Sequence, residues 1–369
     1  MKYITIEDCC EILDSMRIPI TACNRTDGKY PYYGANGIQD YIDNYIFDDD
    51  LVLLAEDGGN FGSKEKPIAY RVSGKCWVNN HAHVLKPKKG INVDFLCYSL
   101  MFYDTSELVN GATRQKLTQA AMRKMRIPDI PEKEQVELVD ILNVVQSTIK
   151  QYKTLINKCD SLVKARFVEM FGDVQHEGKY KGIRLRELCT TMSGGTPSTK
   201  FPKYYDGDIP WISTVSLGPN HIDGSTAKGY ITKEAIDKSA TKLIPADNIL
   251  FGTRVGVGKS SLNDVDICTN QDIVAIIGID ENRFRRLFIK HVLDAYQPYY
   301  DSIKKGATIV GITGDDLKNT LIPDAPIELQ MEYETFVEQV DKSKLAVQQS
   351  LEKTQLLFDS LMQEYFGEN

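Results

Sequence analysis

Ile127-Pro128-Asp129-Ile130-Pro131 and Ile322-Pro323-Asp324-Ala325-Pro326 belong to two copies of one longer stretch. Each copy opens with Gly-Ala-Thr, at residues 111 and 306, and closes with Phe-Gly, at residues 171 and 366. Every residue of the second copy therefore lies 195 positions after its counterpart (111 to 306, 171 to 366). Because no insertion or deletion separates the copies over about sixty residues, they are a duplicated structural unit.

The second half of each copy has the pattern of a long helix. From Glu132 to Phe171, apolar residues recur in steps of mainly three and four, without Gly or Pro: Val145, Ile149, Tyr152, Ile156, Cys159, Val163 and Met170. Residues Glu328 to Phe366 repeat this seam. A heptad seam held over several repeats predicts a coiled-coil helix, here roughly 60 Å long. Since neither helix buries its seam alone, we expect the two to pack antiparallel on each other.

A mixed, mostly β module precedes each helix. In the first we predict strands at Leu51–Ala55 and Cys76–Leu85, helices at Asp8–Leu13 and Asp94–Tyr103, and a loop at Tyr30–Gly37. The second module follows the first only in outline and at no constant offset. The expected fold is α+β: two mixed α/β domains and two long antiparallel coiled-coil helices, with approximate twofold symmetry. The predicted domains are residues 1–130, 131–172, 173–325 and 326–369.

The overall charge of −7 argues at first against a nucleic-acid partner. Nine acidic residues and three lysines lie between Pro326 and Asn369, which gives that segment −6 and leaves the rest near −1. A local basic surface could therefore still bind DNA. The eight cysteines contain no C-x-x-C pair, so we expect free thiols. No stretch approaches 18 uninterrupted apolar residues and the N-terminus lacks an apolar signal core, so we expect a cytoplasmic protein.

Two further motifs lie in the second module: Ser193-Gly194-Gly195-Thr196-Pro197-Ser198, and Tyr204-Tyr205-Asp206-Gly207-Asp208-Ile209-Pro210-Trp211. Together with the duplicated stretch, they resemble the specificity (S) subunit of Type I restriction–modification systems. The resemblance covers essentially the whole chain, in the order module, helix, module, helix. The Tyr30-to-Asn36 segment of the first module departs from the Gly-Gly-Thr-Pro pattern, as expected where the DNA target varies.

The resemblance implies a subunit that reads DNA sequence, without catalysis of its own. Each module would be a target-recognition domain for one half of a bipartite site, and the helices would set the spacer between the halves. Double-stranded DNA, two methyltransferase (M) subunits and restriction (R) subunits are the implied partners. S-adenosylmethionine, ATP and Mg would act in those partners, in DNA methylation and phage defence, and this chain would hold no cofactor.

Catalytic and metal-binding alternatives are weak in the sequence. No Asn/Asp-Pro-Pro-aromatic tetrapeptide of an amino-methyltransferase occurs. The run Thr253–Ser260 has Thr253 where a phosphate loop needs Gly, so we favour a turn presenting Arg254 and Lys259 to the DNA backbone. His81 and His83 would share one strand face, but a third metal ligand is missing nearby.

Candidate DNA contacts are polar, cationic, aromatic or Gly residues in expected loops and turns. Asn79, Asn80, His81, Asn270 and Gln271 are candidates for base edges, because Asn and Gln can pair bidentately with adenine; holding a turn is an equally good role for these amides. The remaining candidates are chosen by residue type and position: Tyr30, Tyr32, Asn36, Lys64, Arg114, Gly195, Thr196, Ser198, Lys200, Thr214, Arg254 and Lys259.

Two alternative functions remain open at this point. A coiled-coil adaptor whose modules bind protein would share the same architecture. So would the recognition subunit of a Type II-like bifunctional restriction complex, with different partners. Sequence-dependent DNA binding distinguishes the first from a DNA reader.

Overall fold

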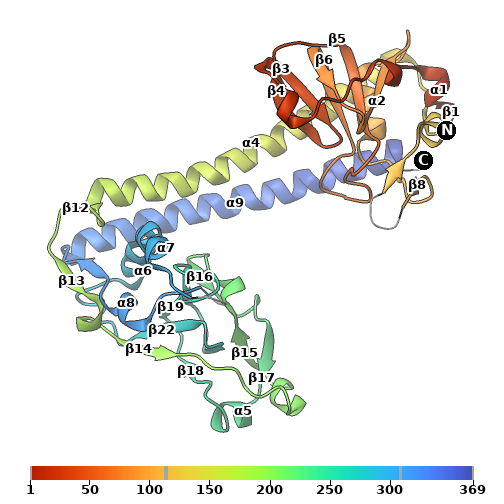
Figure 1. Ribbon diagram of the computed structural model, residues 1–369. Helices are drawn as coiled ribbons and strands as arrows, with labels where there is room; N and C mark the ends of the chain where they lie inside the picture. The colour runs from red at the N-terminus through yellow and green to blue at the C-terminus, as the bar shows by residue number, and fades with distance from the viewer. Residues whose placement is uncertain (1, 112–114, 307–309, 368–369) are drawn as a thin grey trace. The chain divides into compact units, whose positions relative to one another are not determined.

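The computed structural model describes residues 2–111, 115–306 and 310–367. The chain forms two compact units, coloured by residue number in Figure 1. Unit 1 comprises Met1–Thr154 together with Val347–Asn369, and unit 2 comprises Leu155–Ala346. Each unit therefore contains one module and a part of both long helices. The division into four consecutive domains stays a prediction.

Unit 1 is built on a six-stranded sheet in the order β2-β7-β5-β6-β3-β4. Its strands are β2 (Cys10–Ile12), β3 (Asp27–Gly34), β4 (Gly37–Ile42), β5 (Phe47–Ala55), β6 (Ala69–Val78) and β7 (Ala82–Pro87). Its shorter elements are β1 (Tyr3–Thr5), α1 (Ile6–Cys9), η1 (Asp14–Met16), η2 (Ala22–Asn24), α2 (Val93–Met101), β8 (Val109–Asn110), β9 (Lys116–Leu117), α3 (Gln119–Arg123) and β10 (Arg126–Pro128). Strand β5 lies between β7 and β6 inside the sheet, and its residues Leu51 to Ala55 are all fully buried.

Three sequence predictions in unit 1 need correction. The expected helix at Asp8–Leu13 is instead the short helix α1 followed by strand β2. The expected loop at Tyr30–Gly37 is mostly strand β3, with register irregularities on either side of Pro31 that tolerate its missing N–H. The expected single strand Cys76–Leu85 is interrupted by a turn between β6 and β7. The strand at Leu51–Ala55 and the helix at Asp94–Tyr103 are confirmed by β5 and α2.

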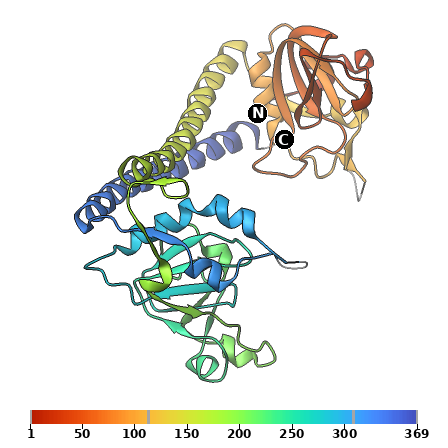
Figure 2. The same ribbon diagram turned by 60° about the vertical axis from the view of Figure 1, so that its left-hand side comes forward.

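Unit 2 contains a five-stranded sheet, β14-β22-β19-β20-β16, and a four-stranded sheet, β17-β15-β21-β18. Their strands are β14 (Thr190–Ser193), β15 (Ile209–Ile212), β16 (His221–Ile222), β17 (Gly229–Ile231), β18 (Leu243–Ile244), β19 (Asn248–Gly252), β20 (Ser260–Asn263), β21 (Ile267–Thr269) and β22 (Ile273–Ile277). The other elements are β11 (Gly172–Asp173), β12 (Glu177–Gly178), β13 (Gly182–Arg184), η3 (Leu185–Glu187), η4 (Pro202–Tyr205), η5 (Thr214–Ser216), α5 (Lys233–Asp237), α6 (Arg286–Ala295), α7 (Gln297–Ile303), α8 (Gly314–Lys318) and β23 (Leu321–Pro323). Figure 2 shows the two sheets of this unit from a second direction.

The duplicated Ile-Pro-Asp motif forms the same ribbon in both units. Strand β1 pairs antiparallel with β10, and β13 pairs in the same way with β23. Beyond each ribbon, the amide of the motif's aspartate donates to a lysine carbonyl: Asp129 to Lys2 at 2.8 Å and Asp324 to Lys181 at 2.9 Å. Each ribbon therefore ties the start of a module to the residues that enter the long helix.

The long helices are α4 (Glu132–Phe171) and α9 (Ile327–Phe366), of 40 residues each. In unit 2, Arg166 of α4 pairs with Glu332 at 2.7 Å, and Asp160 pairs with Lys344 further along α9. Contacts that advance along one helix while receding along the other show that the two run antiparallel there, as predicted. In unit 1, the first part of α4 lies beside the last part of α9 (Figure 1).

A duplicated glutamine fastens each long helix to its module. Gln135 is buried; its Oε1 accepts from the Asn92 amide at 2.8 Å and its Nε2 donates to the Gly90 and Ile130 carbonyls at 3.0 and 2.9 Å. Asn92 is the N-cap of α2, so the glutamine joins the first turn of α4 to the start of α2. The signal Pro-x-x-x-Gln in both copies therefore has a structural reason.

Gln330, its counterpart in unit 2, repeats this arrangement. It accepts from the amide of Arg285, the N-cap of α6, at 2.9 Å, and donates to the Arg283 and Ala325 carbonyls at 3.2 and 2.8 Å. The two copies thus use the same three hydrogen bonds to orient a long helix on a module.

The duplicated Phe-Gly motif completes the opposite unit. Phe366, at the end of α9, packs on Phe95 of α2 with ring centroids 5.7 Å apart, within the core of unit 1. Phe171, at the end of α4, packs on Phe288 of α6 at 4.6 Å, within the core of unit 2. Gly172 follows with φ of 81°, a left-handed conformation that suits the end of a helix. Each long helix therefore starts in one unit and supplies core residues to the other.

No helix within the described residues is both long and apolar enough to cross a membrane.

Candidate nucleic-acid interface

A turn with an asparagine at its start occupies the same place in both units. In unit 1, β3 and β6 pair in parallel, and the Asn79 amide after β6 donates to the Tyr33 carbonyl at 3.0 Å. In unit 2, β15 and β21 pair in parallel, and the Asn270 amide after β21 donates to the Ile212 carbonyl at 3.1 Å. The structure thus places Asn79-Asn80 and Asn270-Gln271 at corresponding positions.

Both asparagine side chains hold their own turns. Oδ1 of Asn79 accepts from the His81 amide at 2.8 Å, and its Nδ2 donates to Gln39. Oδ1 of Asn270 accepts from the Asp272 amide at 3.3 Å. Asn79 is 3% exposed, and a base contact by its side chain stays a prediction. The residues that follow, Asn80 and Gln271, are exposed.

Beside each turn lies a pair of charged or ionisable side chains, and the order of charges is inverted between the units. In unit 1, the Glu56 amide donates to the His81 carbonyl at 2.9 Å, and the Asp57 carboxylate lies 3.4 Å from His81 Nδ1. In unit 2, the Thr253 amide donates to the Asp272 carbonyl at 2.8 Å, and the Arg254 guanidinium lies 3.5 Å from the Asp272 carboxylate.

The hydrogen-bond register makes this correspondence independent of sequence similarity. The Leu117 amide donates to the Glu56 carbonyl, and the Ile312 amide donates to the Thr253 carbonyl, both at 2.8 Å. Leu117 and Ile312 are counterparts in the duplicated stretch. Asp57 therefore corresponds to Arg254.

The Gly-Gly-Thr-Pro motif of unit 2 forms a tight clasp. The Gly195 amide donates to the Thr269 carbonyl at 2.8 Å, and its carbonyl accepts from Trp211 Nε1 at 3.1 Å. A Cβ at Gly195 would lie 2.5 Å from the Ala240 carbonyl carbon. Gly195 is buried, and the glycine allows two backbones to approach. DNA contact by Gly195 stays a prediction.

The clasp presents the next residues at the surface. Thr196 is exposed, and its hydroxyl donates to Oε1 of Gln271. Ser198 and Lys200 are also exposed, with the Lys200 amide donating to the Ser198 hydroxyl at 3.4 Å. The structure therefore brings Thr196 and Gln271 together, as sequence-based candidates from motifs far apart in the chain.

Arg254 lines a polar hollow of about 480 Å³ in unit 2. The hollow is also lined by Gln271, Lys305 and Thr313, among other residues. Lys259, predicted to act beside Arg254, is exposed but does not line it. Lys305 was not predicted, although it directly precedes the duplicated Gly-Ala-Thr.

Thr214 is 4% exposed, and DNA contact by this residue stays a prediction. The segment after Lys259 begins strand β20 rather than a helix, and a phosphate loop requires a helix at that point. The structure thus agrees with a turn, and not a nucleotide site, at Thr253–Ser260.

The aromatic candidates of unit 1 divide into a buried and a partly exposed residue. Tyr32 is 1% exposed, with the Arg25 guanidinium 4.1 Å from its ring centroid, and its DNA contact stays a prediction. Tyr30 is half-buried against Tyr45, with ring centroids 5.1 Å apart. The ammonium of Lys75 lies 4.5 Å from the Tyr45 ring centroid. Tyr30, Tyr45 and Lys75 therefore form a mixed aromatic and cationic group.

The other candidates of unit 1 lie in its loops. The Asn36 side chain donates to the Gly58 carbonyl at 3.0 Å, which joins the β3–β4 turn to the loop after β5. Lys64 is exposed in that same loop, and His81 is half-buried. Arg114 lies outside the described residues. DNA contact by the exposed candidates stays a prediction.

A buried ionic cluster of unit 1 contains the only group of three potential metal ligands found within the described residues: Asp14, Glu56 and His83. His83 Nδ1 lies 2.6 Å from an Asp14 oxygen, and Nε2 lies 2.9 Å from the Leu117 carbonyl. Both ring nitrogens thus lie within hydrogen-bond distance of a protein oxygen.

Cationic and amide groups complete this cluster. The Arg17 guanidinium lies 2.6 Å from Glu56 and 3.5 Å from Asp14, and Gln119 donates to Asp14 at 2.9 Å. Burial favours a higher pKa for Asp14, but hydrogen bonds from His83, Gln119 and the Val84 amide hold that pKa below its usual value. Ion pairs and hydrogen bonds therefore link Arg17, Glu56, Asp14, His83 and Gln119 inside unit 1.

Comparisons with known proteins agree with the fold. The family described as Type I restriction modification DNA specificity domain matches residues 1–159 and 177–356. The chain belongs to this family. A Haemophilus influenzae protein provisionally named a type I restriction enzyme specificity subunit is 27% identical over 380 residues, covering 95% of this chain and 92% of that protein. The Escherichia coli EcoR124I/EcoR124II specificity subunit is 30% identical over 253 residues, covering 64% and 60% of the two chains.

Solved structures show the same fold. The S subunit of a Type I restriction–modification system from M. genitalium has a TM-score of 0.61 at 14% identity, covering 99% of this chain and 96% of that one. A chain from a study of assembly and conformational transition of the type I R-M system has a TM-score of 0.60 at 15% identity, covering 99% and 97%. The chain is thus similar to specificity subunits over both modules and both long helices.

Proposed function

We propose that the chain is the non-catalytic specificity subunit of a Type I restriction–modification complex, and that each unit reads one half of a bipartite DNA site. The observation that carries this proposal is the corresponding turn in the two units. Its framework is the same in both, whereas the exposed residues Asn80 and Gln271 and the flanking Asp57 and Arg254 differ. One framework with different polar side chains suits two readers with different targets.

The long helices would set the spacer between the half-sites and seat two methyltransferase subunits. Two pairs of duplicated positions expose an apolar side chain in both copies: Val136 with Met331, and Leu162 with Leu357. Each unit holds one member of each pair. Exposed apolar residues at equivalent positions suit two identical partners.

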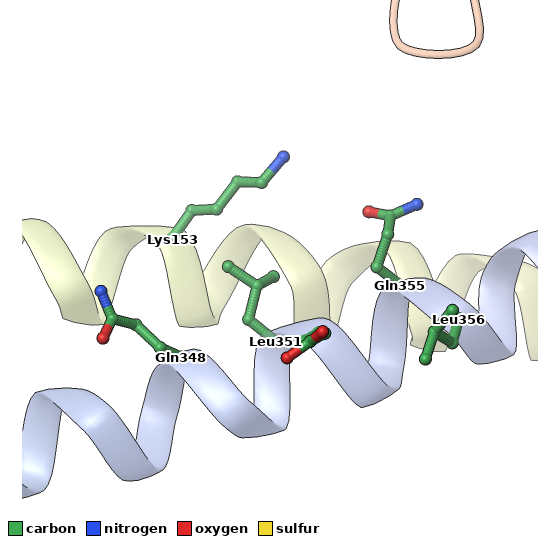
Figure 3. A pocket seen from close by; sticks show the side chains of 6 residues that line it. Lys153, Gln348, Leu351, Gln355 and Leu356 are labelled. Atoms are coloured by element: carbon green, nitrogen blue, oxygen red, sulfur yellow. The ribbon is translucent and has the colours of Figure 1, made fainter. Parts of the chain in front are cut away.

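The helices of unit 1 also carry a shallow groove of about 350 Å³, lined by Leu351 and Leu356 between Lys153, Gln348, Glu352 and Gln355 (Figure 3). This groove adds apolar surface to the helix pair. Restriction subunits would join the same assembly, and S-adenosylmethionine, ATP and Mg would act in the partner subunits.

Sequence-dependent DNA binding tests the proposal. The full chain, purified with its methyltransferase partner, should shift a duplex carrying both half-sites and should lose affinity when either half is scrambled. Equal affinity for intact and fully scrambled duplexes would contradict DNA reading and favour a protein-binding adaptor.

Changing helix length tests the spacer. Inserting seven residues, one heptad, into both long helices should lengthen the preferred spacer, because the seam stays in register. Inserting four residues into one helix should instead disrupt the seam. An unchanged spacer preference in the heptad variant would count against the helices as a ruler.

A further inference from the structure

Asp57 and Arg254 occupy corresponding places beside the two turns but carry opposite charges. Residues that contact the DNA backbone are not expected to differ in this way. Both units would meet the same phosphate backbone, so residues that bind phosphate should be cationic in both. Arg254 of unit 2 nevertheless corresponds to a carboxylate, Asp57, in unit 1. A position that changes sign between two readers is better suited to distinguishing bases than to holding the backbone.

Arg254 has the access and the bracing that base readout requires. Its side chain is 50% exposed on the wall of the polar hollow, while the partner Asp272 is only 14% exposed. The Asp272 carboxylate also accepts from Asn270 Nδ2 at 3.2 Å, so the turn itself fixes the acid that orients the guanidinium. A guanidinium that is paired with a carboxylate at 3.5 Å through one nitrogen still has N–H groups to offer a second partner.

Polar side chains also lie beside Arg254 on the wall of the hollow. Gln271 lines the same hollow and has its amide oriented by Thr196. Lys305 forms an isolated antiparallel β-bridge with Gly311, through two backbone hydrogen bonds of 2.9 and 3.0 Å. The Asp316 carboxylate accepts hydrogen bonds from the Thr313 amide and hydroxyl, at 2.8 and 2.7 Å. The carboxylate that lines the hollow, Asp316, therefore has internal donors.

We propose that the position of Arg254 and Asp57 determines specificity: Arg254 selects a guanine in the half-site of unit 2, and Asp57 disfavours guanine at the corresponding place in unit 1. Arginine donates two N–H groups to O6 and N7 of guanine in the major groove, whereas a carboxylate is repelled by these acceptors and accepts from an amino group. This inference rests on the proposed function. It assigns Arg254 to a base edge instead of the phosphate contact expected from the sequence.

A set of duplexes with each half-site position varied in turn tests the assignment, using the full chain with its methyltransferase partner. Arg254→Ala should lower affinity for the preferred site roughly tenfold or more and should remove base preference at one position only. That position should be a guanine in the preferred site. Replacing this guanine by 7-deazaguanine, which lacks N7, should weaken the wild type and leave Arg254→Ala unchanged.

Lys305→Ala provides the matched comparison, because Lys305 lines the same hollow as a point charge. It should weaken all duplexes by a similar factor and lower the salt dependence, as expected for a phosphate contact. Arg254→Lys should retain the charge and part of the guanine preference, which separates readout from misfolding. Uniform weakening by Arg254→Ala, an unchanged affinity, or a relaxed position other than guanine would overturn the assignment. A wild type without any sequence preference would instead overturn the proposed function.

Discussion

Removing the glutamine that joins α9 to unit 2 should destabilise that unit specifically. Gln330 is fully buried and makes hydrogen bonds of 2.9, 3.2 and 2.8 Å to three backbone groups. Gln330→Ala leaves the Arg285 amide and the Arg283 and Ala325 carbonyls without this partner. At roughly 1 kcal/mol for each net hydrogen bond, the free energy of unfolding of unit 2 should fall by about 3 kcal/mol.

Hydrogen–deuterium exchange resolves the effect by segment, because the two units need not unfold together. A loss of about 3 kcal/mol corresponds to roughly 100-fold faster exchange in α6 and the first turns of α9, wherever exchange requires opening of unit 2. Gln135→Ala should produce the same change in α2 and the first turns of α4 instead.

Gln339→Ala is the matched control, since Gln339 is an exposed glutamine on the same helix. Its effect should stay within about 0.5 kcal/mol. If Gln330→Ala exchanges no faster than Gln339→Ala, the glutamine does not fasten the helix, and the reasoning is refuted.

Three further predictions concern each unit and its surface. Burial holds the pKa of His291 well below its ordinary value of 6.5, so the unfolded chain alone takes up this proton as pH falls below 6.5. Urea titrations should show unit 2 losing up to about 1.4 kcal/mol per pH unit in that range, and His291→Asn should flatten the dependence. Phe366→Ala should cost unit 1 about 3 kcal/mol, seen as faster exchange in α2. Gly195→Ala puts a Cβ 2.5 Å from the Ala240 carbonyl carbon and should weaken binding of the unit 2 half-site, whereas Gly229→Ala, with no atom within 4 Å, should not.

Each of these has an outcome that contradicts it. A flat pH dependence above pH 5 would mean that His291 is already protonated in the folded chain. Leu357→Ala, at a 51% exposed residue of the same helix, should leave exchange in α2 unchanged. An equal effect of Phe366→Ala and Leu357→Ala would mean that the end of α9 does not complete the core of unit 1. Equal DNA affinity of Gly195→Ala and the wild type would mean that the clasp at Gly195 does not contribute to the DNA interface.

The long helices were predictable because their heptads and Pro/Gly limits are local signals. The expected helices, Glu132 to Phe171 and Glu328 to Phe366, lie within one residue of the observed Glu132–Phe171 and Ile327–Phe366. The segment around Pro31 misled the prediction, because its Pro, Gly and aromatic residues are typical of a loop, while pairing with two neighbouring strands makes it β3. Tertiary pairing overrode the local pattern there.

The interface was predictable only in part. Asn79-Asn80 and Asn270-Gln271 stood out by residue type, and the structure gives them the same turn. The correspondence of Asp57 and Arg254 was not visible, because the modules align at no constant offset and only the hydrogen-bond register matches them. Tyr32 and Thr214 are buried, and no local signal in the sequence shows which polar or aromatic residue faces the core.

The central claim is that each unit reads one half of a split site, and mapping of methylated adenines in cells that carry the chain with its partner subunits tests it most directly. The account predicts one motif of two short specified halves, separated by a spacer of constant length, with methyladenine in both halves. Arg254→Ala should relax one guanine position in one half and leave the other half unchanged. A contiguous motif, or a methylation pattern that is the same without the chain, would contradict it.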